Sequence, residues 1–252
     1  MNIGIIGLGN MGRAFYDLFL KAGHTLFVAC PHEKDIATFQ TRDNREIVDR
    51  SDIIFLGVKP YMVKSVMKEI EDKIEGQTIV SMAAGVNLES LRAMAPTEKI
   101  IRVLPNTPIT VGKGVIAYTP GYDMSDEEKE NFEALLAPAG LIMEMDEGNL
   151  DIVTALAGAT PAFVAMIVEA FSDGALQCGM KRADTYKIAA AAIAGSCEQL
   201  LQEGLHPGQL KDKVCSPGGA TIEGVLAMER AGVRGALSDA MIETVQKGKS
   251  LA

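Results

Sequence analysis

The first half of the chain takes its fold from the stretch Asn2-Ile3-Gly4-Ile5-Ile6-Gly7-Leu8-Gly9-Asn10-Met11-Gly12. It begins as an apolar strand and leads into a helical pattern from Arg13 to Ala22. A Gly-x-Gly-x-x-Gly turn alone is weak evidence, but one placed between a strand and a helix is typical of a dinucleotide-binding fold, whose pyrophosphate lies at the helix N-terminus. The glycines permit a tight turn, a close approach to the pyrophosphate and close packing of helix on strand. The cofactor-binding residues expected in this turn are Gly7, Gly9, Asn10, Met11 and Gly12.

The choice between NAD and NADP is read at the end of the second expected strand, Thr25 to Cys30. An NAD-binding fold usually places an acid there against the ribose 2′-hydroxyl, but this strand ends in Ala29 and Cys30. In the loop that follows, His32 and Lys34 are candidates to meet a 2′-phosphate, although two acids in the same loop dilute the positive charge. A solvated turn remains the alternative, because the loop has no arginine. The sequence therefore favours NADP(H) over NAD(H).

Composition excludes several classes of partner. The chain has 252 residues, 48% of them hydrophobic, and a net charge of −9 without a basic stripe, so we expect no nucleic-acid partner. The four cysteines form no Cys-x-x-Cys pair, which predicts neither a disulfide framework nor a metal site. They are typical of reduced thiols in a cytoplasmic protein.

Neither a signal peptide nor a membrane span is expected. The first strand begins at residue 2 without a preceding basic and apolar leader. The longest uncharged run, Ile152 to Val168, is shorter than the ~20 apolar residues of a spanning helix. Gly158 and Pro161 interrupt this run, and we expect it to be buried rather than inserted in a membrane.

The pattern of the chain changes near residue 147. Before that point, apolar runs alternate with helical patterns, which indicates a mostly parallel sheet flanked by helices. The runs are Ile53 to Val58, Thr78 to Met82, Ile100 to Leu104, Val115 to Tyr118 and Leu141 to Met145. After it, long helices are expected, with Pro161 suited to a first helical turn and Ile188 to Cys197 uncharged and rich in alanine. The predicted fold class is α/β, with a Rossmann domain at 1–146 and an all-helical domain at 147–252 that is a candidate for dimerisation.

A second candidate site is the stretch Cys215-Ser216-Pro217-Gly218-Gly219-Ala220-Thr221. Adjacent glycines allow successive backbone N–H groups to converge on an anion, and the two hydroxyls can donate or accept hydrogen bonds. A small carboxylate would fit there. An ordinary turn between two helices is the plainer interpretation.

These features together resemble the pyrroline-5-carboxylate reductase family, which makes proline by reducing a cyclic imine. The resemblance rests on four segments in the family's order, of which the last is its signature: Gly7 to Gly12, Val58-Lys59-Pro60, Arg102 to Pro108, and His206 to Asp212 leading into Val214 to Thr221. It implies intertwined helical domains in a homodimer or a higher homo-oligomer, with the site between domains. It also implies that Asn44, Val58, Lys59, Pro60, Ala83, Ala84 and Gly85 contact the cofactor.

The resemblance further implies that Ser216, Gly219, Ala220 and Thr221 hold the substrate carboxylate, with Thr221 as the catalytic residue close to the ring nitrogen. The expected reaction is NADPH-dependent hydride transfer to the imine carbon of 1-pyrroline-5-carboxylate, which gives L-proline. Plainer interpretations remain for the other segments. Arg102 to Pro108 can be a strand that ends in a turn, with Arg102 paired on the surface, and His206 is expected at a helix terminus rather than as an acid or base.

Some residues depart from the family pattern. The chain has Gly158-Ala159-Thr160-Pro161-Ala162-Phe163 where the family usually has Gly-Ser-Gly-Pro-Ala-Tyr, and Ala191 and Ala192 replace a common Gln-Thr pair. A divergent paralogue that reduces another cyclic imino acid is therefore one alternative. A β-hydroxyacid dehydrogenase is another, but it needs a lysine that is missing between Ala134 and Met180. A non-catalytic NADP-binding protein is the third.

Overall fold

The computed structural model describes residues 1–95 and 97–250. Its backbone contacts divide the chain into two compact units. The first, here called the nucleotide unit, holds Met1–Ala159 and the chain from Val245 onward, and the second, the helical unit, holds Thr160–Thr244. The division falls within a long helix that begins at Glu147, so the domain boundary expected near residue 147 stays a prediction.

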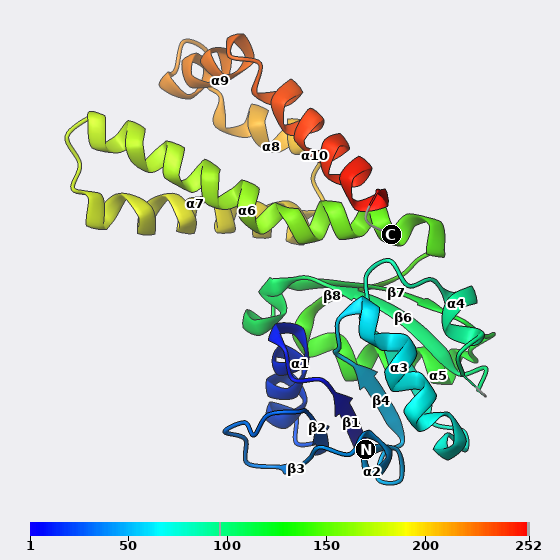
Figure 1. Cartoon of the computed structure of the whole chain (residues 1–252). Coiled ribbons are helices and arrows are strands. Elements are labelled where there is room, and N and C mark those ends of the chain that lie inside the picture. Colours follow the sequence, from blue (N-terminus) through cyan, green and yellow to red (C-terminus); the bar gives the residue numbers. More distant parts are fainter. Residues whose placement is uncertain (96, 251–252) are drawn as a thin grey trace. The chain divides into compact units, whose positions relative to one another are not determined.

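The nucleotide unit contains an eight-stranded sheet in the described residues, with strand order β3-β2-β1-β4-β5-β6-β7-β8 (Figure 1). All neighbouring strands are parallel except β6 and β7, which confirms the predicted, mostly parallel sheet. The strands are β1 (Asn2–Ile6), β2 (Thr25–Ala29), β3 (Phe39–Thr41), β4 (Ile53–Leu56), β5 (Thr78–Ser81), β6 (Ile100–Pro105), β7 (Gly114–Pro120) and β8 (Gly140–Glu144).

Helices cover both faces of this sheet, as expected for a Rossmann domain. On one face, the rings of Phe15 and Phe19 from α1 pack against Phe55 of β4, and Phe132 of α5 packs against Tyr118 of β7. On the other face, α2, α3 and α4 contribute to a second apolar cluster. The helices of this unit are α1 (Asn10–Lys21), α2 (Asn44–Val48), α3 (Pro60–Ile70), α4 (Leu88–Arg92) and α5 (Asp126–Leu136), with short 3-10 helices η1 (Glu71–Lys73), η2 (Thr107–Val111) and η3 (Ala137–Ala139).

The helical unit has no apolar core of its own within one chain. Among its described residues only Ser172 and Thr185 are buried, and their hydroxyl oxygens lie 2.5 Å apart. Large apolar side chains are instead exposed, such as Met166 at 68% and Leu201 at 76%. The helices are α6 (Glu147–Gln177), which begins in the nucleotide unit, α7 (Arg182–Glu203), α8 (Pro207–Val214), α9 (Ala220–Arg230) and α10 (Val233–Lys249).

The expectation that Gly158 and Pro161 interrupt the apolar run in α6 was wrong, and the expected burial of that run stays a prediction. Pro161 lies inside the helix rather than in a first turn, so neither it nor Gly158 interrupts the run. The run is also not buried within one chain. By length and composition alone α6 could cross a membrane, because its most apolar 18-residue window has a mean hydropathy of 1.8. Only 6% of that window is buried within the chain. An apolar helix with so little cover in its own chain needs cover from elsewhere.

Candidate functional site

The glycine turn lies where β1 leads into α1. Gly7 has a φ of +96°, which an L side chain rarely adopts, and a Cβ on Gly12 would overlap the carbonyl oxygen of Gly7. Gly9 is the N-cap of α1 and makes no side-chain cap, so the first N–H groups of the helix stay open. This turn therefore fits a pyrophosphate, which needs close backbone approach and free N–H donors.

Two further strand-end loops lie at the same edge of the sheet. Because β1, β4 and β5 are parallel neighbours, the loops that follow them leave from one edge. The loop after β4 contains Val58, whose side chain lies so near the glycine turn that a Cβ on Gly7 would come within 2.8 Å of it. Lys59 in the same loop is the N-cap of α3, and Pro60 is the first residue of that helix. After β5 come Ala83 and Ala84, then Gly85 with a φ of +78°. The structure thus brings the predicted residues of the glycine turn, 58–60 and 83–85 to one edge of the nucleotide unit.

The loop after β2 is folded against β3 by the side chain of Gln40. Its Oε1 accepts a hydrogen bond from the backbone N–H of Lys34 at 3.2 Å, and its Nε2 donates to the carbonyl of His32 at 3.4 Å. Lys34 lines a pocket of about 300 Å³, and Arg42 lines it as well. His32 is not among the residues that line this pocket. Arg42 follows the next strand, β3, and so lies outside the loop in which a basic residue was expected.

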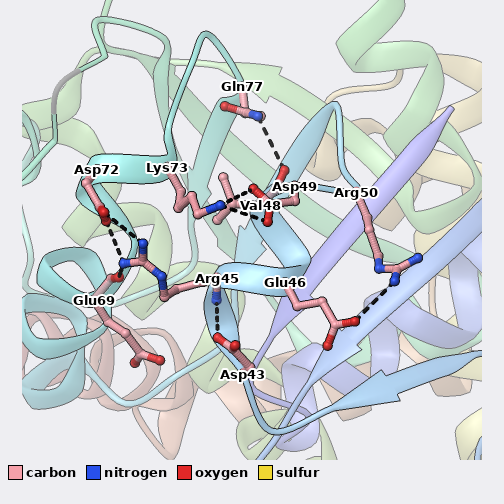
Figure 2. Close-up of polar contacts among 10 residues, drawn as sticks. All are labelled: Asp43, Arg45, Glu46, Val48, Asp49, Arg50, Glu69, Asp72, Lys73 and Gln77. Atoms are coloured by element: carbon pink, nitrogen blue, oxygen red, sulfur yellow. Dashed lines mark hydrogen bonds and ion pairs between the residues drawn. The ribbon is translucent and has the colours of Figure 1, made fainter.

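Asn44 is the first residue of α2, next to a polar network that links α2 to the end of α3 and to η1. Figure 2 shows this network around Arg45, Glu69 and Asp72. The Nδ2 of Asn44 donates to Glu69 Oε2 at 2.8 Å, and its neighbour Arg45 forms two hydrogen bonds with the Asp72 carboxylate at 2.6 and 2.7 Å. Arg45 also donates to the backbone carbonyl of Glu69 at 3.0 Å. The hydrogen bond from Arg45 lowers the pKa of the Asp72 carboxyl. This network fixes the start of α2, and whether Asn44 contacts the cofactor stays a prediction.

Arg102 is buried rather than paired on the surface, so that expectation was wrong. Its side chain is 4% exposed, and its guanidinium lies 2.8 Å from Glu147 and 3.6 Å from Asp151 on the first turns of α6. Glu147 Oε1 also accepts the backbone N–H of Leu88 at 2.7 Å. Because an isolated charge is costly to bury, the two carboxylates explain how an arginine can lie in a sheet strand. Arg102 therefore joins β6 to the beginning of α6 within the nucleotide unit.

Asn106 directly follows the same strand and makes a second link to α6. Its Oδ1 accepts the N–H of Val115 at 2.8 Å, and its Nδ2 donates to the carbonyl of Ala157 at 2.9 Å. Ala157 lies four residues before Pro161, and a proline inside a helix leaves the carbonyl four residues earlier without its usual N–H partner. Asn106 supplies that partner. The plainer interpretation of this segment, a strand that ends in a turn, is confirmed by the 3-10 helix η2 that follows.

In the helical unit, the expected substrate-binding stretch connects α8 to α9. The N–H of Gly219 donates to the carbonyl of Ser216 at 3.0 Å, and Gly218 has a φ of +66°, as a turn with Pro217 at its second position favours. Gly219 is the N-cap of α9 without a side-chain cap. The N–H groups of the first turn of α9 and the exposed hydroxyl of Thr221 are therefore available to an anion.

His206 caps the N-terminus of α8, which confirms the expectation of a helix-terminus residue. Its Nδ1 accepts the N–H of Gly208 at 3.1 Å, and its own N–H donates to Gln209 Oε1 at 3.1 Å. Across residues 1–95 and 97–250, no group of three or more His, Cys, Asp or Glu side chains is arranged to hold a metal ion.

Comparison with known proteins gives consistent matches over both units. Residues 147–251 match the family model described as pyrroline-5-carboxylate reductase dimerisation, and residues 2–85 match one described as NADP oxidoreductase coenzyme F420-dependent. Pyrroline-5-carboxylate reductase of Escherichia coli (strain K12) is 37% identical over 99% of this chain and 98% of its own length. The chain belongs to the pyrroline-5-carboxylate reductase family. The human pyrroline-5-carboxylate reductase 2 is 36% identical over 96% of this chain and 81% of its own.

Solved structures of the pyrroline-5-carboxylate reductase family share the fold. The Plasmodium falciparum pyrroline carboxylate reductase with NADP bound has a TM-score of 0.89 and 29% identity, and covers 99% of this chain and 97% of its own. These matches confirm the Rossmann class of the N-terminal domain and the helical class of the C-terminal domain.

Proposed function

We propose that this chain is an NADPH-dependent reductase that converts 1-pyrroline-5-carboxylate to L-proline. The observation that carries the proposal is the 37% identity to a pyrroline-5-carboxylate reductase over 99% of the chain. The open glycine turn of α1 supports a dinucleotide cofactor, and the NADP-bound structure of the Plasmodium falciparum reductase supports NADP(H). The net charge of −9 supports a small-molecule substrate rather than a nucleic acid.

In the proposed reaction, the dihydronicotinamide supplies a hydride to the imine carbon while the C=N π pair moves to nitrogen, and protonation of nitrogen completes the amine. The protein aligns the substrate with the cofactor and stabilises the charges of the reacting groups. The turn with Gly7, Gly9 and Gly12 would bind the pyrophosphate of the cofactor. The residues expected to hold the substrate carboxylate are Ser216, Gly219, Ala220 and Thr221. The helix N-terminus favours that negative charge. The Thr221 hydroxyl donates a hydrogen bond to the ring nitrogen or relays a proton to it from water.

The proposal includes a homodimer in the cytoplasm. The helical unit leaves its apolar side chains exposed within one chain, and this region matches a dimerisation family model. A second copy would cover these side chains, including the apolar face of α6, so no membrane is needed to account for them. The cytoplasmic location is supported by four free cysteines, since none forms a disulfide in the part of the chain that the structure describes.

The activity is tested by NADPH oxidation with 1-pyrroline-5-carboxylate beside other cyclic imino acids. Oxidation with the first substrate at the highest kcat/KM supports the proposal, whereas a preference for another imino acid would identify a divergent paralogue. No turnover together with tight NADPH binding would favour a non-catalytic protein.

Thr221→Ala tests the catalytic role on the same substrate. It should lower kcat by about 10- to 100-fold, at or below the lower end of the range for a positioned acid–base group, and leave the affinity for NADPH unchanged, because the glycine turn lies in the other unit. Thr221→Ser should recover much of the rate. Thr244→Ala is the control, since the Thr244 hydroxyl donates to the Ala240 carbonyl within α10. A Thr221→Ala protein with the wild-type rate would show that the hydroxyl only stabilises the turn.

A further inference from the structure

Arg42 lies beside the position at which cofactor choice is made. The edge strand β3 is parallel to β2, with Thr41 opposite Ala29, and the N–H of Cys30 donates to the Thr41 carbonyl at 3.1 Å. Arg42 is the next residue after Thr41, so it leaves the sheet at the level of Cys30. In an NAD-binding fold, the end of β2 carries an acid that binds the ribose 2′-hydroxyl. Here that end carries no acid, and β3 supplies an arginine next to it.

The loop after β2 is fixed in a shape that brings a second cation to Arg42. The carbonyl of His32 accepts hydrogen bonds from Gln40 Nε2 and, at 2.9 Å, from the Cys30 thiol. With the N–H of Lys34 bound to Gln40 Oε1, the loop is tied to β3 at two backbone groups. Lys34 and Arg42 consequently line one pocket of about 300 Å³. Its other lining residues are Glu33, Ile36, Gln40 and Thr41.

Both cations are available to a ligand. Among the ion pairs of the described residues, none includes Lys34 or Arg42. The other arginine near this loop, Arg13, is already engaged, because it pairs with Asp17 at 2.9 Å and donates to the carbonyl of Asp35 at 3.3 Å. The pocket therefore has two unpaired cations against the single carboxylate of Glu33.

We propose that Arg42, together with Lys34, binds the 2′-phosphate of the cofactor and is the residue that makes this chain prefer NADPH to NADH. This inference rests on the proposed function as an NADPH-dependent reductase. The guanidinium presents a planar fork of donors that matches two phosphate oxygens, and Lys34 adds a point charge. NADH has only a hydroxyl at this position, so the same cations contribute little to its binding. Selectivity follows from that difference in affinity.

The experiment measures the dissociation constants of NADP⁺ and NAD⁺ by calorimetry for the wild type and for Arg42→Met and Lys34→Met. Lys68→Met is the matched control, because Lys68 is an exposed cation on α3 outside the pocket. Adenosine 2′-phosphate serves as a probe of the phosphate site alone. kcat/KM with NADPH and with NADH is measured on the same proteins, and thermal unfolding checks that each variant is folded.

Arg42→Met should weaken the binding of NADP⁺ and of adenosine 2′-phosphate about 10- to 100-fold, the range for hydrogen bonds to a charged group. The affinity for NAD⁺ should change by less than about twofold. Lys34→Met should weaken NADP⁺ binding by a smaller factor, and Lys68→Met should leave the affinities for both cofactors unchanged. A folded Arg42→Met protein with the wild-type ratio of NADP⁺ to NAD⁺ affinity overturns the inference and leaves the proposed function standing. A wild type that binds neither dinucleotide overturns the proposed function itself.

Discussion

Replacing Asn106 by alanine should lower the free energy of unfolding of the nucleotide unit by about 2 to 4 kcal/mol, because two backbone groups lose their partners. Asn106 is 7% exposed as a whole residue, so water does not simply replace its side chain. It accepts the N–H of Val115 at 2.8 Å and donates to the Ala157 carbonyl at 2.9 Å. An unpaired buried N–H or C=O costs about 1 to 3 kcal/mol, and Ala157 is only partly buried, which sets the lower part of the range.

The Ala157 half of this cost depends on Pro161. In an uninterrupted helix the N–H of residue 161 would bond the Ala157 carbonyl, and proline has no N–H. Pro161→Ala restores that donor, so the loss of Asn106 should cost less in a Pro161→Ala background. The expected coupling between the two substitutions is about 1 kcal/mol, the value of one hydrogen bond.

Urea denaturation of the wild type, the two single variants and the double variant measures this coupling. Tyrosine fluorescence is a suitable probe, because the chain has no tryptophan and four of its five tyrosines lie in residues 1–159. Asn149→Ala is the control: Asn149 is exposed near the start of α6, and its replacement should change stability by less than about 0.5 kcal/mol. Strictly additive effects of the two substitutions would refute the role assigned to Asn106.

Two further outcomes follow from the glycine turn and from the helical unit. Gly12→Ala should destabilise the protein by about 1 to 3 kcal/mol and weaken dinucleotide binding, because the new methyl group overlaps the Gly7 carbonyl oxygen. Gly148→Ala is the control: its methyl group meets nothing within 4 Å, so the unfolding temperature should not change. Unchanged unfolding temperature and affinity in Gly12→Ala would contradict the close packing described. Light scattering of the purified protein should give a dimer or a larger assembly, and a compact monomer at micromolar concentration would contradict the proposed homodimer.

The nucleotide unit was predictable because its signals are local. Glycine is needed at position 7 because of its positive φ, and at position 12 because a Cβ there would overlap the Gly7 carbonyl oxygen, five residues earlier. The apolar runs also alternate with helices along the chain. The structure begins and ends the predicted strands within two residues of the expected positions, and the Rossmann class follows from their order. The helical unit was predictable as a class from its small apolar residues, and its match to a dimerisation family model agrees.

The errors share a different cause, since each depends on a partner far away in the sequence. Pro161 was taken for a helix start because the rule for proline considers one helix alone, and Asn106, which replaces the missing donor, lies directly after a sheet strand. Arg102 stands within the apolar run of β6, and its carboxylate partner Glu147 comes 45 residues later. A charge inside an apolar run was a usable signal, because such a charge needs a partner when it is buried. The role proposed for Arg42 has no signal of this kind, because the preceding strand β3 is three residues long and carries no periodic pattern.

The candidate substrate turn lies in a unit that has no apolar core of its own within one chain. Ser216 to Thr221 comprises the connection between α8 and α9 and the first two residues of α9, and neither helix has a buried residue in the single chain. Hydrophobic burial is the main force that holds helices together, so these helices cannot fix the turn through their own core. The cover must come from a second copy if the chain is the proposed homodimer. In that case the first turn of α9 is ordered only in the assembly, and the proposed carboxylate site depends on association even though every residue assigned to it comes from one chain.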